Sequence, residues 1–132
     1  MEEFELKATA KTPYIYFNGQ SGEMILQGRA ISQPDEDFWA PVLKWFYAYA
    51  TAPNKTTKVI FSLEYFNISS SKQILFLLHK MNDLFEEGYD VSIEWRYSDD
   101  DLEMKESGFD FSCVVNVPFI FKNIEYEVSA VI

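Results

Sequence analysis

The sequence has one cysteine and no long apolar run. With Cys113 alone, no disulfide can form within the chain, and this favours a reducing compartment. No apolar stretch approaches the roughly 20 residues that a membrane-spanning helix needs. The first residues, Met1 to Glu5, lack the charged-then-apolar pattern of a secretory signal. We therefore expect a soluble, cytoplasmic protein without membrane insertion.

Basic residues are scarce as well. The 132 residues include 11 lysines and arginines against 21 aspartates and glutamates, which gives a formal net charge of -10. Nucleic-acid binding needs a basic surface for the phosphate backbone, so we expect no nucleic-acid partner. Anionic membrane surfaces are disfavoured for the same reason. The acidity is compatible with a basic protein partner, although it often serves only solubility.

Residues for catalysis and metal binding are few. His79 is the only histidine, and no serine or cysteine stands in a nucleophile motif such as Gly-x-Ser-x-Gly. The acidic cluster at residues 99–103 lacks a calcium-loop glycine, because Met104 stands at the sixth position. We interpret these acids as the first turn of a helix, with a partner-facing acidic patch as the alternative. The sequence therefore predicts no enzyme, no metal site and no cofactor.

The hydrophobic pattern predicts strands and helices that alternate within one domain, residues 1–132. Strands are predicted at residues 14–17, 23–27, 57–66, 91–97 and 116–121. Helices are predicted from Pro34 to about Thr51, from Ser69 to about Glu87, and from Ser98 or Asp99 to about Glu106. This order predicts an α/β fold with a mixed sheet of about five strands and helices packed over it.

The strand at residues 57–66 is predicted to lie inside the sheet. Val59, Phe61, Leu63 and Tyr65 alternate onto one face. Because both faces are largely apolar at the start of the strand, we expect cover on both sides of the sheet.

The most informative segment is Asn67-Ile68-Ser69-Ser70-Ser71-Lys72, where a strand ends and a helix begins. Ligand and regulatory sites in open α/β sheets gather at the carboxyl ends of strands. One serine suffices to cap the helix, so two serines are surplus to capping. A phosphate here would meet backbone N–H groups and the positive end of the helix, and would add about -1.5 to -2 charges. From the residues alone, capping is favoured over a switch.

Arg29 stands at a strand end in a chain with few arginines. Two placements are open for it. It either pairs with an acid of the following helix, which is the favoured placement, or lies near the serine segment.

Several segments together resemble the SiaC-like family of bacterial regulatory phosphoproteins. The strongest match is residues 63–72, which read Leu-Glu-Tyr-Phe-Asn-Ile-Ser-Ser-Ser-Lys. Further matching segments are Thr12 to Ile15, Gly28-Arg29, Phe38 to Trp45, Trp95 to Met104, and Asn116 to Phe119. They follow one another in the family's order over nearly the whole chain.

The resemblance implies a single domain with a STAS-like fold, similar to the anti-sigma-factor antagonists, and a non-enzymatic role. In the family, a partner-switching protein kinase phosphorylates the start of this helix and a PP2C-type phosphatase reverses the reaction. The unphosphorylated form binds a GGDEF diguanylate cyclase and promotes cyclic-di-GMP synthesis, which supports biofilm formation. The partner-binding residues implied for this chain are Tyr65, Asn67, Ile68, Ser69, Ser70, Ser71 and Lys72.

One departure from the family pattern concerns the phosphate acceptor. The family places a threonine directly after the asparagine, whereas this chain has Ile68, which lacks a hydroxyl group. We therefore predict phosphorylation at Ser69, with Ser70 as the alternative, because an exposed capping serine is accessible to a kinase. The competing hypotheses are a constitutive protein-binding module and an anti-sigma-factor-antagonist-like adaptor without a phosphoswitch.

Overall fold

The computed structural model describes residues 2–33 and 37–124. In this part of the chain six strands form one sheet, and each strand lies beside its sequence neighbours. The first three strands pair antiparallel, and the third to the sixth pair parallel. The strands are β1 (Glu3–Leu6), β2 (Tyr14–Asn18), β3 (Glu23–Ala30), β4 (Thr56–Phe66), β5 (Asp90–Tyr97) and β6 (Phe119–Asn123). The predicted α/β class with a mixed sheet is confirmed, with six strands instead of about five.

The strand that the sequence pattern missed is β1. It has only four residues, Glu3-Phe4-Glu5-Leu6, within an acidic N-terminal segment. This alternation of polar and apolar residues is too short to predict a strand. The ring of Phe4 packs against Trp45, and Glu5 accepts a hydrogen bond of 2.6 Å from the Tyr14 hydroxyl group. Contacts with distant parts of the chain therefore stabilise a strand too short to be predicted locally.

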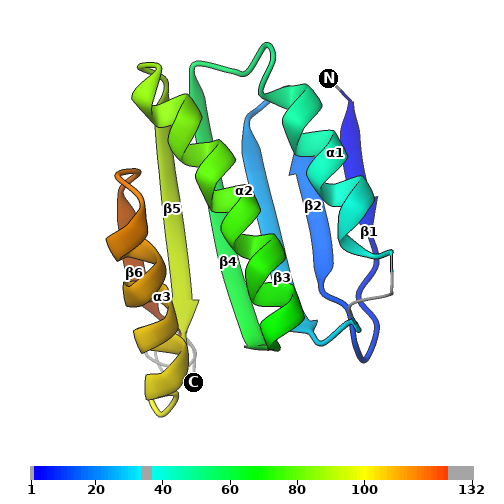
Figure 1. Cartoon of the computed structure of the whole chain (residues 1–132), viewed down its shortest axis with the longest axis vertical. Coiled ribbons are helices and arrows are strands. Elements are labelled where there is room, and N and C mark those ends of the chain that lie inside the picture. Colours follow the sequence, from blue (N-terminus) through cyan, green and yellow to red (C-terminus); the bar gives the residue numbers. More distant parts are fainter. Residues whose placement is uncertain (1, 34–36, 125–132) are drawn as a thin grey trace, which may run out of the picture.

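All three helices cover the same face of the sheet (Figure 1). They are α1 (Trp39–Tyr49), α2 (Ile68–Glu86) and α3 (Leu102–Val114). Crossover connections between parallel strands are almost always right-handed, and here the strand order never reverses, so successive helices fall on one side. Within the described residues no helix lies on the opposite face, so for this part of the chain the prediction that β4 is covered on both faces is wrong.

The two faces of β4 differ accordingly. Val59, Phe61 and Leu63 are buried beneath the helices. On the opposite face, Lys58 is exposed and Ile60 is only half-buried. Within the described residues no helix is both long and apolar enough to span a bilayer.

The boundaries of α1 differ from the prediction at its start. The helix begins at Trp39, and Asp37 precedes it. The predicted start at Pro34 falls in residues 34–36, outside the described residues. Pro41 lies in the first turn of α1, where its missing N–H costs little.

The boundaries of α3 are also different. Asp101 caps this helix through a bond from the Met104 N–H, in place of the predicted Ser98 or Asp99. The helix continues to Val114 instead of ending near Glu106. The following strand begins at Phe119, later than the predicted Asn116.

The predicted end of α2 is confirmed. Gly88 follows the last turn with a φ of 102°, a left-handed conformation that glycine adopts readily. Its N–H donates to Phe85 O, and the Tyr89 N–H donates to Leu84 O. Together these bonds satisfy carbonyl groups that the end of a helix leaves without partners.

Trp95 on β5 is the centre of the core at the α3 end of the sheet. Its side chain is fully buried, and its indole N–H donates to Met104 O at 2.9 Å. The rings of Phe61, Phe66, Phe111 and Phe119 surround it; Phe66 meets it edge-on with centroids 6.3 Å apart. Gly108 lets α3 approach this indole, because a Cβ atom there would overlap the ring. A glycine that resembles a helix end is therefore a packing position within α3.

We predict that Gly108→Ala destabilises the protein, although alanine normally favours a helix over glycine. The added methyl group would overlap Trp95, and overpacking of this kind costs about 1–3 kcal/mol. The expected result is a lower midpoint in urea denaturation. The neighbouring Ser107→Ala, which improves helix propensity without meeting Trp95, serves as the control, and equal midpoints for the two variants would contradict the packing role.

Candidate functional site

The first turn of α2 is held in place by Asn67. Its side-chain oxygen accepts a bond of 3.0 Å from the Ser70 N–H, and its amide nitrogen donates to Ser32 O at 3.0 Å. Its backbone N–H donates to Ala30 O at 3.0 Å. Asn67 thus caps the helix, and the prediction that one of the serines is the cap is wrong. All three serines lie in the first helical turn.

The three serines have different surroundings. The side chain of Ser70 is fully buried, and its hydroxyl oxygen accepts a hydrogen bond of 3.4 Å from the Trp39 indole N–H. The Ser71 hydroxyl group donates to Ile68 O at 2.8 Å. Ser69 is half-buried and lines surface hollows on two sides. The prediction of an exposed Ser70 is therefore wrong, because this side chain belongs to the interface between α1 and α2.

A surface hollow of about 520 Å³ lies at the start of α2. Its apolar members are unusually open to solvent, since Ile68 is 81% exposed and Tyr65 is 50% exposed. Most of the predicted partner-binding residues meet here, whereas Ser70 and Ser71 do not line the hollow. Its lining residues are Tyr65, Asn67, Ile68, Ser69, Lys72 and Gln73.

A second hollow, of about 260 Å³, continues from the first towards α1. Ser69 and Gln73 line both hollows. Trp39, Ala40 and Leu43 contribute the α1 side of the second one. The candidate surface is therefore wider than the sequence segment that predicted it, and it includes residues of α1 that sequence reasoning missed.

A bulge in β4 exposes Tyr65. Gly28 pairs with Leu63, but the next residue of β3, Arg29, pairs with Tyr65, so Glu64 is an extra residue in β4. The insertion reverses the alternation of side chains, which turns Tyr65 outward and Phe66 inward against Trp95. The prediction that Tyr65 shares the buried face is therefore wrong. Gly28 could have indicated the bulge from the sequence, because a glycine inside a strand often marks one.

Arg29 lies beside this surface. Its guanidinium carbon is 6.0 Å from the centre of the Tyr65 ring, within range of a cation–π interaction. The structure therefore places Arg29 near the serine segment, whereas Asp35 and Glu36, two acids of the predicted helix start, fall outside the described residues.

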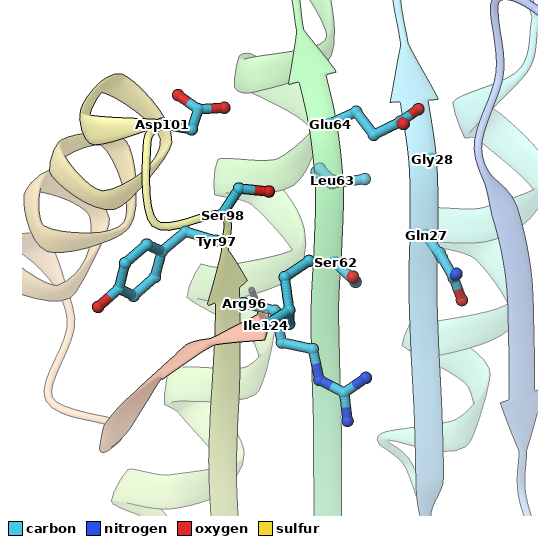
Figure 2. A pocket seen from close by; sticks show the side chains of 10 residues that line it. All are labelled: Gln27, Gly28, Ser62, Leu63, Glu64, Arg96, Tyr97, Ser98, Asp101 and Ile124. Carbon is cyan, nitrogen blue, oxygen red and sulfur yellow. The ribbon is translucent and has the colours of Figure 1, made fainter. Parts of the chain in front are cut away.

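The uncovered face of the sheet carries another hollow, of about 440 Å³, which Figure 2 shows at close range. Polar side chains from three strands and from the turn before α3 line it, among them Ser62, Glu64, Arg96 and Asp101. Arg96 forms an ion pair with Glu94, which lies on the same strand. One member of this lining, Arg96, therefore belongs to a charge network across the sheet.

Glu94 is the buried carboxylate of that network. Burial raises the pKa of Glu94, but the hydrogen bond from Arg96 and the charges of Arg96 and Lys58 lower it further, leaving this pKa below its ordinary value. The Lys58 ammonium group lies 3.6 Å from the Glu94 carboxylate. Glu94 thus remains charged at neutral pH and serves to pair the two cations.

The other candidate groups from the sequence do not come together. His79 is exposed on α2. Asp101 caps α3, and Asp99 accepts a bond of 2.7 Å from Asn123. Across residues 2–33 and 37–124, no group of three or more histidine, cysteine, aspartate or glutamate side chains is placed to hold a metal ion.

We predict that Asn67→Ala destabilises the protein by about 1–2 kcal/mol, the usual loss for an N-cap. The variant removes the acceptor for the Ser70 N–H and the donor to Ser32 O. Urea denaturation of this variant and of Ser71→Ala, whose hydroxyl group only bonds back into the helix, provides the comparison. A Ser71→Ala loss as large as that of Asn67→Ala would mean that the serines cap α2 after all.

Two solved structures from Pseudomonas aeruginosa share this fold. Apo-SiaC matches with a TM-score of 0.86 at 22% identity, over 92% of this chain and 99% of that chain. A chain in the crystal structure of the diguanylate cyclase SiaD in complex with its activator SiaC matches with a TM-score of 0.83 at 23% identity. That match covers 91% of this chain and 98% of the other.

Sequence comparison points in the same direction. A protein of Pseudomonas aeruginosa (strain UCBPP-PA14) is 23% identical over 119 residues, which cover 90% of this chain and 94% of that protein. The model of the SiaC family of regulatory phosphoproteins matches residues 6–124. These residues include every strand from β2 to β6 and all three helices. This chain therefore belongs to the SiaC family of regulatory phosphoproteins.

Proposed function

We propose that this chain is a non-enzymatic signalling module that binds a GGDEF diguanylate cyclase and activates it. The observation that carries the proposal is the exposed apolar surface around Tyr65 and Ile68 at the start of α2. Large apolar side chains open to solvent are typical of protein-binding sites. The relative SiaC, which shares this fold, is described as the activator of the cyclase SiaD in their complex. The whole chain, residues 1–132, then acts as one regulatory domain in the cytoplasm.

The proposal includes control by a protein kinase and a PP2C-type phosphatase, with Ser69 as the phosphate acceptor. Ser70 is buried against Trp39, so its phosphorylation would require the first turn of α2 to separate from α1. Ser69 is half-buried and borders the hollow that holds Lys72. A phosphate on Ser69 would lie near the first N–H groups of α2, which have no acceptor within the helix. The modification would therefore be tolerated by the fold and would change the charge of the docking surface.

We predict that Ser69→Asp weakens cyclase binding at least about tenfold, equivalent to about 1.4 kcal/mol. The added carboxylate would stand in the hollow that the partner is proposed to fill. The measurement is the dissociation constant for the diguanylate cyclase of the same organism, with cyclic-di-GMP production as a second readout. Ser112→Asp, on α3, is the control for the added charge, and Ser69→Ala should bind as the unmodified chain does.

Mass spectrometry of the protein from its native host tests the acceptor directly. We expect phosphate on Ser69 in at least one growth state and none on the buried Ser70. Phosphate on Ser70, or on no serine of residues 69–71 in any growth state, would remove Ser69 as the switch.

A constitutive binding module, or an adaptor without a phosphoswitch, is the second candidate. Ile68 favours it, because the position that carries the family's acceptor has no hydroxyl group here and its side chain is 81% exposed. On this alternative, Ser69→Asp and the unmodified chain bind the cyclase equally well. The affinity comparison above therefore separates the two candidates.

A further inference from the structure

The outer surface of α1 and the first part of α2 has a charge opposite to that of the chain. The whole chain has a net charge of -10. Between Phe38 and Asn82, by contrast, Glu64 is the only acidic residue, and it lies in β4 on the edge of the hollow in the uncovered sheet face. The two helices present Lys44, Lys72 and Lys80 over the same span. A cationic stretch is therefore set into an acidic protein, with Asp37 in the hollow at its start and Asp83 after Lys80 at its end.

Large apolar side chains lie between these lysines. Tyr47 on α1 is 43% exposed and Phe76 on α2 is 47% exposed. Lys72, Phe76 and Lys80 follow one another at a spacing of four residues, which places them along one side of the helix. Leu43 and Tyr47 have the same spacing on α1.

The two rows of side chains lie next to each other. The Lys80 ammonium group is 5.5 Å from the centre of the Tyr47 ring. Nearer the helix starts, Leu43 lines the same hollow as Ser69 and Gln73. Figure 1 shows α1 and α2 side by side over the same face of the sheet. We call this surface the α1–α2 seam, defined by Leu43, Lys44, Tyr47, Lys72, Phe76 and Lys80.

We propose that the α1–α2 seam binds an acidic amphipathic helix of a protein partner. Apolar residues of that helix at positions i, i+3, i+4 and i+7 would pack between Leu43, Tyr47 and Phe76, as in other helix-in-groove complexes. Glutamates or aspartates on its flanks would meet the three lysines. The 11 residues of α1 rise about 16 Å, which matches a partner helix of about three turns.

The exposed side of α3 does not fit such a partner. It also presents apolar side chains, since Leu102 is 64% and Phe109 is 59% exposed. Here, however, Glu103, Glu106 and Asp110 stand among them, and all three are exposed. An acidic helix would be repelled from α3, and the charge pattern therefore selects the α1–α2 seam.

This inference deepens the proposed function, on which it rests, because it identifies the chemistry of the partner segment. Ser69 lies at one end of the seam and shares a hollow with Lys72. A phosphate on Ser69 would add about -1.5 to -2 charges there. The phosphate would offset the positive charge of Lys72 and repel an acidic helix. Phosphorylation would therefore release the partner helix from the seam.

The test is the affinity of the double variant Lys72→Glu/Lys80→Glu for the full-length diguanylate cyclase of the same organism. We expect a loss of at least about tenfold and a weaker dependence on salt concentration than for the unmodified chain. The control Lys11→Glu/Lys105→Glu changes the net charge equally, at exposed lysines outside the seam, and should bind within about threefold of the unmodified chain. Equal losses for both variants, or no loss for either, would overturn the seam proposal while leaving the proposed function intact.

If the cyclase does not bind the unmodified chain, the proposed function is refuted. A second probe then still tests the α1–α2 seam. This probe is a synthetic helix of about 18 residues with leucines on one side and glutamates on the other. We expect it to shift the amide resonances of Leu43, Tyr47 and Phe76, and we expect a peptide with lysines in place of the glutamates to leave them unchanged. Equal shifts with both peptides, or shifts at Leu102 and Phe109 instead, would overturn the proposal.

Discussion

The start of α2 depends on the buried contact between Ser70 and Trp39. A hydroxyl group in an apolar interior is costly unless it has a hydrogen-bond partner, and the indole N–H of Trp39 supplies one. The same contact joins α1 to α2, while Asn67 joins the helix start to Ser32 and Ala30. With the first turn held from both sides, the side chains that face outward are determined, and Ile68 and Ser69 are among them.

Because all three helices lie on one side of the sheet, its two faces have different roles. The face beneath the helices holds the aromatic core around Trp95. The uncovered face carries the Glu94 carboxylate, which pairs with Lys58 on the neighbouring strand and with Arg96 on its own strand. The outer surface of the helices is then left for partners. At the start of α2 the bulge at Glu64 adds Tyr65 to the candidate surface, a side chain that a regular strand would have buried.

The distribution of charge connects these features to regulation. Lys44, Lys72 and Lys80 give the surface of α1 and α2 a local attraction for acidic groups that the net charge of the chain conceals. A single added phosphate, with about -1.5 to -2 charges, would offset about half or more of the positive charge of these three lysines. A switch of this kind needs no change of fold, only a change of charge at the edge of a preformed surface.

The sequence by itself determined the order of the elements, the mixed α/β class and the segment at the start of α2. Hydrophobic periodicity and turn residues are local signals. Both are clear in α2, where buried apolar residues recur at helical spacing and Gly88 follows the last turn. Tertiary contacts decided the rest. The strand β1 is stabilised by the packing of Phe4 on Trp45. Gly108 lies within α3 because Trp95 occupies the adjacent space. The bulge in β4 exchanges the sides of the sheet to which Tyr65 and Phe66 point. Which serine is buried was also beyond the sequence, because all three follow one another and only the position of Trp39 distinguishes Ser70 from Ser69.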